Sequence, residues 1–82
     1  MEPENTTAQR ELSHGEKAVG LTFNPSNDPD IQNIKELYAQ IIDFCNTKRG
    51  ESEGERARHF SVAITDAETA QMRAVKAITW KD

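Results

Sequence analysis

Apolar residues recur at steps of three and four along two long stretches of the chain. In the first, from about residue 29 to 48, the repeating positions are Ile31, Ile34, Tyr38, Ile41, Ile42 and Cys45, and Leu37 and Phe44 widen the stripe. In the second, from about residue 53 to 79, the apolar side is rich in alanine and comprises Ala57, Phe60, Ile64, Ala67, Ala70, Ala74, Ala77 and Ile78. Such spacing is typical of amphipathic helices. The pattern predicts an all-α fold built on two helices.

Local signals mark the ends of these helices. Asp28-Pro29-Asp30 favours a helix start, because aspartate caps free amides and proline is tolerated in the first turn. Gly50 can adopt the left-handed conformation that ends a helix. Ser52, with Glu55 three residues later, matches a capping box for the second helix. The sequence therefore predicts a helical hairpin with a short polar connection over residues 50–54.

The first part of the chain lacks helical periodicity. Residues 1–17 are polar and cannot offset their ordering entropy by burial, which predicts a largely disordered tail. From residue 18, Val19, Leu21 and Phe23 alternate with polar residues and glycine, the pattern of an extended segment with one buried side. A turn is expected over residues 24–27. We therefore expect a folded domain over residues 18–82, with a short extended arm lying against a helix.

The apolar surface of the hairpin is wider than one neighbouring helix can cover. The stripe of the first helix exceeds a single face, and the second helix would be on the order of 40 Å long against about 30 Å for the first. Small residues such as Ala67 and Ala70 allow close approach of backbones. These features predict a helical homo-oligomer.

Composition narrows the class of function. The chain has 82 residues, of which 35% are hydrophobic and 6% aromatic, so it has room for one small domain. Its net charge of -4 argues against broad binding to DNA, which needs a basic face. Cys45 is the single cysteine. We expect it to have a structural role in a reducing cytoplasm and not to act as a reactive thiol. We find neither a membrane-spanning apolar run nor a secretory leader, and we expect a soluble protein without membrane partners.

Catalytic machinery is not visible in the sequence. His14 falls in the predicted tail and His59 stands alone, so metal-ligand spacing is missing. A nucleophile pair of Cys45 with His59 would need a third group and a cleft. The glycine-rich phosphate loops of nucleotide-hydrolysing enzymes are also missing. We expect a protein that is not an enzyme and needs no cofactor.

A second stripe on the C-terminal helix is the main candidate for chemistry. Its members share one face through alternating four- and three-residue steps and are Arg58, Val62, Thr65, Thr69, Met72 and Lys76. Hydroxyl groups beside basic side chains make good phosphate partners. The alternative is that both threonines bond back to the preceding helical turn while the basic groups pair with surface acids. Likewise, Lys35 is either a solvated helix residue or a ligand, and Phe23 is either a hydrophobic staple or a base-stacking platform.

Two segments resemble a known family. They are Ala18-Val19-Gly20-Leu21-Thr22-Phe23-Asn24-Pro25-Ser26 leading to Asp28-Pro29 and Ile34-Lys35, and the run from Ala63-Ile64-Thr65-Asp66 to Val75-Lys76-Ala77. Together they look like the helical-hairpin domain shared by bacteriophage anti-CBASS and anti-Thoeris sponge proteins. The resemblance covers about residues 18–80. It implies a compact helical assembly, hexameric in the best-known branch, that sequesters cyclic oligonucleotide or cyclic ADP-ribose-type signals of bacterial immunity without cleaving them.

The resemblance also implies roles for single residues. Lys35 matches a first-helix lysine that contacts ligand phosphate in a cyclic-dinucleotide pocket. Thr65 and Thr69 match a threonine-containing segment near a second type of pocket, and Lys76 matches a basic position there. In the arm, Gly20 is followed by Leu21 where the family carries an aromatic, and the aromatic comes only at Phe23. Where the family has an arginine before its Thr-Asp pair, this chain has Ile64.

Together these observations predict a sponge that binds cyclic dinucleotides or trinucleotides in the cytoplasm of an infected bacterium. The candidate ligand-binding residues are Gly20, Leu21, Phe23, Lys35, Arg58, Thr65, Thr69 and Lys76. The main rival is a small phage regulatory or assembly protein whose hairpin binds another protein. An enzyme acting on a separate substrate is the third reading.

Overall fold

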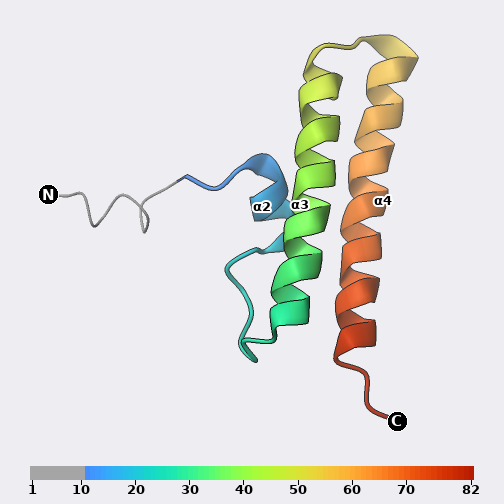
Figure 1. The fold of residues 1–82 in the computed structure, drawn as a ribbon. Coiled ribbons are helices and arrows are strands. Elements are labelled where there is room, and N and C mark those ends of the chain that lie inside the picture. The colour runs from blue at the N-terminus through green and yellow to red at the C-terminus, as the bar shows by residue number, and fades with distance from the viewer. Residues whose placement is uncertain (1–10) are drawn as a thin grey trace, which may run out of the picture.

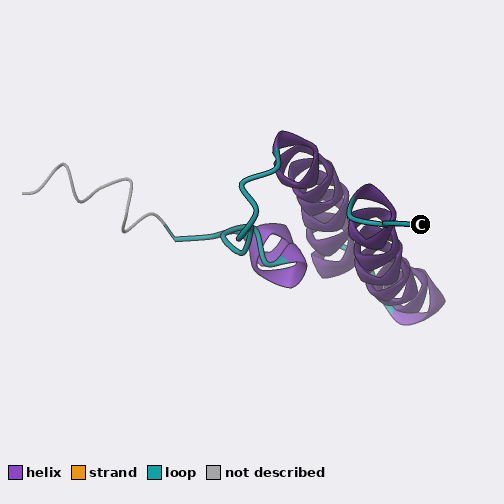
Figure 2. Cartoon of the chain, turned by 90° about the horizontal axis from the view of Figure 1, so that it is seen from below, coloured by secondary structure: helices purple, strands orange, loops and turns teal. Residues whose placement is uncertain are grey.

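Three helices form the part of the chain that the structure describes, residues 11–82 of a computed structural model. They are α2 (His14–Val19), α3 (Pro29–Gly50) and α4 (Gly54–Ile78). α3 and α4 run antiparallel as a hairpin, and α2 lies against α3 (Figure 1). Seen along the hairpin, α2 keeps to one side of α3 (Figure 2). Residues 11–82 contain no strand, which confirms the predicted all-α hairpin for this range.

The N-terminal prediction differs from the structure over residues 14–19. These residues form α2, where the sequence predicted a tail up to residue 17 and an extended arm from residue 18. A capping box starts the helix: the Ser13 hydroxyl accepts from the Glu16 amide at 3.1 Å, and the Glu16 carboxylate accepts from the Ser13 amide at 2.9 Å. Val19 is buried and anchors the helix to the core. Residues 1–10 of the predicted tail lie outside the described residues.

The predicted extended arm is a series of turns. Gly20 takes the left-handed conformation with φ of 64°, which ends α2, and the Leu21 amide donates to the Glu16 carbonyl at 3.0 Å. The Phe23 amide then donates to the Gly20 carbonyl at 2.9 Å, and Asn27 closes the turn expected after Asn24. The alternation of apolar residues was misleading here, because Val19 belongs to the helix while Phe23 lies 70% exposed after the turn.

α3 begins as predicted and ends two residues later than predicted. The Asp28 carboxylate accepts from the Asp30 amide at 2.8 Å, and Pro29 occupies the first turn. Gly50 is still helical, so the prediction that it stops the helix was wrong. The Glu51 amide then closes the end of the helix with a tighter bond, to the Lys48 carbonyl three residues earlier, at 3.1 Å.

α4 covers nearly the predicted range, although its start is built differently. Ser52 was expected to cap it together with Glu55, but the Ser52 hydroxyl donates backwards to the Lys48 carbonyl at 2.7 Å. The residue at the N-cap position, Glu53, makes no side-chain capping bond. Gly54, with φ of 60°, turns the chain into the helix. The Ser52 hydroxyl therefore caps the C-terminal end of α3 and not the start of α4.

The core lies where the three helices meet and is small. Its buried apolar members are Val19, Ala39, Ile42, Ile64 and Ala67, with Ala18, Leu21, Tyr38 and Cys45 packed around them. Ile42 is fully buried. By contrast, Ile41 was expected on the apolar face but is half exposed. A core of this size gives limited stability to a chain of this length.

Candidate functional site

Lys35 is the most unusual side chain in the described structure. It is only 5% exposed, so the reading that it is a solvated helix residue was wrong. Its ammonium donates to the carbonyls of Gly20 at 2.9 Å and Phe23 at 2.6 Å. It also lies 5.5 Å from the centre of the Phe23 ring. Burial of an ammonium is costly unless hydrogen bonds replace water, and the two carbonyls provide them.

The turn after α2 carries the other arm residues of the predicted site. Gly20 places its Cα so that an added Cβ would lie 3.9 Å from the Lys35 ammonium. Leu21 packs against the core and borders a polar hollow of about 370 Å³ beside α2. Phe23 is too exposed to act as a hydrophobic staple, and its ring lies beside the ammonium. We refer to Gly20, Phe23 and Lys35 as the lysine clamp.

The positive charge of Lys35 is not neutralised by the other residues of the lysine clamp. Both hydrogen-bond partners of Lys35 are neutral carbonyls, and no carboxylate among residues 11–82 forms an ion pair with it. An ammonium has three protons to donate, and the two carbonyls accept from two of them. One proton of the buried ammonium therefore has no acceptor among residues 11–82.

The predicted stripe on α4 does share one exposed face. All six members, Arg58, Val62, Thr65, Thr69, Met72 and Lys76, are exposed. The Thr69 hydroxyl donates to the Thr65 carbonyl one turn earlier at 3.2 Å, and the Arg58 guanidinium pairs with Glu55 at 2.9 Å. These are the internal partners that the alternative reading of the stripe expected.

Part of the stripe surrounds a common hollow. Thr69, Met72 and Lys76 line a depression of about 220 Å³ together with Arg73, a residue that the sequence analysis did not select. Arg58 and Thr65 do not border it, nor does any residue of the lysine clamp. The structure therefore separates the predicted site residues into two groups, one formed by α3 and the turn after α2, and one along the exposed face of α4.

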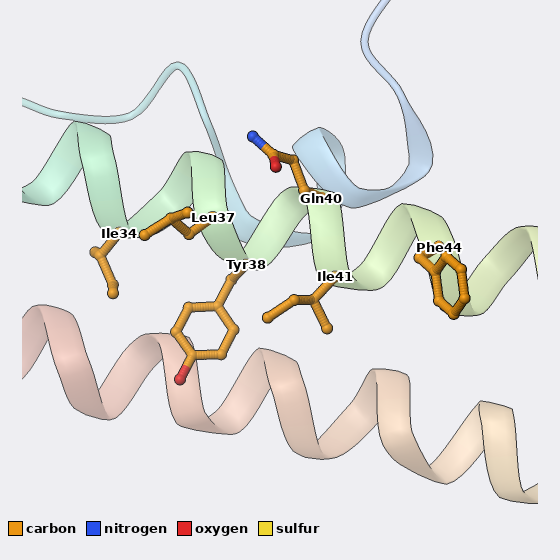
Figure 3. Close-up of a pocket in the computed structure, with 6 residues that line it drawn as sticks. All are labelled: Ile34, Leu37, Tyr38, Gln40, Ile41 and Phe44. Atoms are coloured by element: carbon orange, nitrogen blue, oxygen red, sulfur yellow. The ribbon is translucent and has the colours of Figure 1, made fainter.

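An apolar groove along α3 was also missed as a site. It has a volume of about 540 Å³ and is lined by Ile34, Leu37, Tyr38, Gln40, Ile41 and Phe44. Figure 3 shows Tyr38 directed towards α4, whereas Gln40 points towards the side of α2. Leu37 is 55% exposed and Phe44 is 62% exposed. The sequence signal for this groove was the width of the apolar stripe.

Residues 11–82 contain no group of three side chains that could hold a metal ion. Cys45 packs against the core, while His59 is exposed and lies 3.9 Å from Glu55. His14 is exposed at the start of α2. In the same part of the chain, no helix is long and apolar enough to cross a membrane.

The chain was compared with known proteins. A family model described as "Acb2/Tad1, hairpin domain" matches residues 16–79, which include the end of α2, the lysine clamp, all of α3 and all of α4. No curated protein and no solved structure matches the chain.

Proposed function

We propose the function of this protein from its family. The chain belongs to the Acb2/Tad1 hairpin-domain family, the anti-CBASS and anti-Thoeris sponge proteins. It sequesters cyclic oligonucleotide second messengers, dinucleotides or trinucleotides, and does not cleave them. Cyclic ADP-ribose-type signals are a second ligand class of the same chemistry. Withdrawal of the signal inside the host bacterium leaves the CBASS effector unactivated.

The observation that supports this proposal most strongly is the buried ammonium of Lys35. Position 35 is only 5% exposed. If its side chain served stability alone, an apolar residue would stabilise the fold at least as well as a lysine. Here the charge is held by neutral carbonyls, with the Phe23 ring alongside. Phosphate supplies the missing negative charge, and a nucleobase can stack on the exposed ring. In this proposal Lys35 donates to a ligand phosphate, while Gly20 and Leu21 shape the adjoining turn.

Self-association is part of the proposal, with a hexamer as the expected state. The α3 groove exposes Leu37, Ile41 and Phe44 on one side of the helix. Large exposed apolar patches on small proteins mark interaction surfaces. A second copy that covers this groove adds the apolar burial that the small core lacks. Ligand pockets would then be shared between copies, each of which contributes a lysine clamp.

We assign larger cyclic ligands to the second group of residues on α4. Thr65, Thr69 and Lys76 lie on the exposed face, and Arg58 lies at its beginning. The Thr69 hydroxyl uses its proton to bond to Thr65, but its oxygen can still accept a hydrogen bond from a ligand. Lys76 can bind phosphate directly.

Calorimetric titration with cyclic dinucleotides and trinucleotides tests the proposal. We expect saturable binding by the parent protein and a loss of about tenfold or more for dinucleotides in Lys35→Met, because one charge-assisted hydrogen bond contributes about 1.5–3 kcal/mol. Methionine retains much of the apolar stem and removes the ammonium. Lys17→Met is the matched control, since Lys17 is an exposed lysine on α2.

Thermal unfolding of each variant separates binding from folding. Lys35→Met leaves two carbonyls without their donor, so some loss of stability is expected. The proposal requires that, at the same ligand concentration, cyclic dinucleotides stabilise the parent more than the folded Lys35→Met variant. A panel of cyclic nucleotides that neither binds nor stabilises the parent would favour the rival reading, a regulator that acts through protein contacts.

A further inference from the structure

The C-terminal end of α4 combines an exposed aromatic ring with two basic side chains. Trp80 is 62% exposed. Together with Arg73, Lys76 and Ala77 it lines a hollow of about 390 Å³. This hollow shares Arg73 and Lys76 with the depression that Thr69 and Met72 border. The two depressions thus form one continuous surface, from the threonine to the tryptophan.

The ring of Trp80 is held in place by its neighbours. Its indole nitrogen donates to the Asp82 carboxylate at 3.0 Å, and the Lys76 ammonium lies 5.6 Å from the ring centre. The polar end of the indole is therefore satisfied. What the ring still offers is an exposed aromatic surface, on which planar groups stack.

The cations beside the ring have no acidic partner. The Arg73 guanidinium makes no hydrogen bond or ion pair with any residue of the described range. In the same range, the Lys76 ammonium interacts only with the Trp80 ring. In a chain with a net charge of -4, this is a local excess of positive charge. A planar guanidinium favours phosphate, to which it can donate two parallel hydrogen bonds.

We propose that Trp80, Arg73 and Lys76 form a nucleotide subsite, in which one base of a cyclic oligonucleotide stacks on Trp80 and the adjoining phosphate binds Arg73 and Lys76. This inference rests on the proposed sponge function and specifies how the α4 surface would recognise its ligand. Thr69 contributes its hydroxyl oxygen at the far end of the same surface.

The single tryptophan makes the subsite directly observable. Trp80 is the only tryptophan in the chain, so its fluorescence reports on this position alone. Titration with cyclic triadenylate, with excitation at the red edge of tryptophan absorption, should quench the emission saturably. Calorimetry on the same samples should give the same affinity. Arg73→Gln should weaken binding about tenfold, the effect of losing one charge-assisted hydrogen bond. Trp80→Leu should weaken it by a similar factor through lost stacking.

Lys81→Gln is the matched control, because it removes an equal charge near Trp80 from a residue outside the hollow. It should bind within about twofold of the parent. If calorimetry shows tight binding that Arg73→Gln and Trp80→Leu leave unchanged, the subsite is refuted and the sponge function stands. If no cyclic dinucleotide or trinucleotide binds the parent, both proposals fail. An emission maximum that is already blue-shifted, and that moves to the red on dilution of the protein alone, would show that another copy covers Trp80 and would overturn the inference.

Discussion

Replacing Gly15 by alanine should detach α2 from the hairpin. Gly15 is buried where α2 crosses α3, and its amide donates to the Asp43 carboxylate at 2.6 Å. An added Cβ would overlap the carbonyl oxygen of Ala39 and would lie 2.9 Å from the Asp43 carboxylate oxygen. Because the obstructing atom is backbone of α3, a side-chain rotation cannot relieve the overlap. The helix must move away, and the hydrogen bond is lost with it.

Two contributions set the size of the effect. Overpacking of this kind costs about 1–3 kcal/mol. Loss of a hydrogen bond to a carboxylate costs about 1.5–3 kcal/mol. The two overlap, because a single displacement causes both, so we expect a destabilisation of about 2–4 kcal/mol. That is a large fraction of the stability of a small domain.

Urea unfolding followed by circular dichroism, at a fixed protein concentration, measures this change. The midpoint should fall, and the slope should fall too if α2 is already undocked in the native state, since less surface is then exposed on unfolding. Gly50→Ala is the matched control. Gly50 is helical and has nothing within 4 Å of an added Cβ, so this variant should gain about 0.5–1 kcal/mol. A Gly15→Ala protein with the parent's midpoint and slope would refute the packing described for α2.

Three further substitutions test other parts of the structure. Gln71 is 4% exposed, and its side-chain amide makes no hydrogen bond with any residue in the described range. Gln71→Met should therefore stabilise the chain by about 1–2 kcal/mol in thermal or urea unfolding. A loss of stability would mean that water or another copy satisfies the amide. Gly54 has φ of 60° with open space around it, so Gly54→Ala should lower the free energy of unfolding by about 1–2 kcal/mol through backbone strain alone. An unchanged stability in the same assay would contradict that conformation. Phe44→Glu puts a charge in the α3 groove and should dissociate the assembly, as measured by sedimentation velocity. A parent protein that is itself monomeric would contradict the proposed role of the groove in self-association.

The two long helices were predictable because their signals are local and repeated. Apolar residues every three or four positions, together with the Asp28 cap, indicate α3 without knowledge of its neighbours. The family resemblance was carried by short runs of residues, and the match over residues 16–79 confirms it.

α2 was missed because six residues are too few to show a period. Its signals were a capping box at Ser13 and Glu16, and Gly20 as a left-handed end, which the alternation of Val19, Leu21 and Phe23 concealed. Its stability depends on the contact of Gly15 with α3, and such a tertiary contact leaves no trace in local sequence. The capping box at Ser52 failed because α4 starts one residue later, with Glu53 at the N-cap position, and the Ser52 hydroxyl donates to the Lys48 carbonyl instead.

Within the candidate site, the burial of Lys35 could not be derived from the sequence. A lysine on a helix is exposed in most proteins, and only the turn after Gly20 brings two carbonyls to its ammonium. Arg73 was passed over because it falls between two positions of the chosen stripe, and Trp80 because it lies four residues beyond the last one. Their shared hollow depends on the last turn of α4 and the residues that follow it.

Recovery of the ligand tests the central claim most directly. The purified protein, in molar excess, is mixed with cyclic diadenylate or cyclic triadenylate and passed through a filter that retains protein. The retained fraction is then denatured, and the released nucleotide is identified by mass spectrometry. Sequestration predicts that the filtrate is depleted of signal and that the cyclic nucleotide is recovered intact from the protein fraction. A filtrate that still contains the signal, or recovery of a linear nucleotide, would contradict the account.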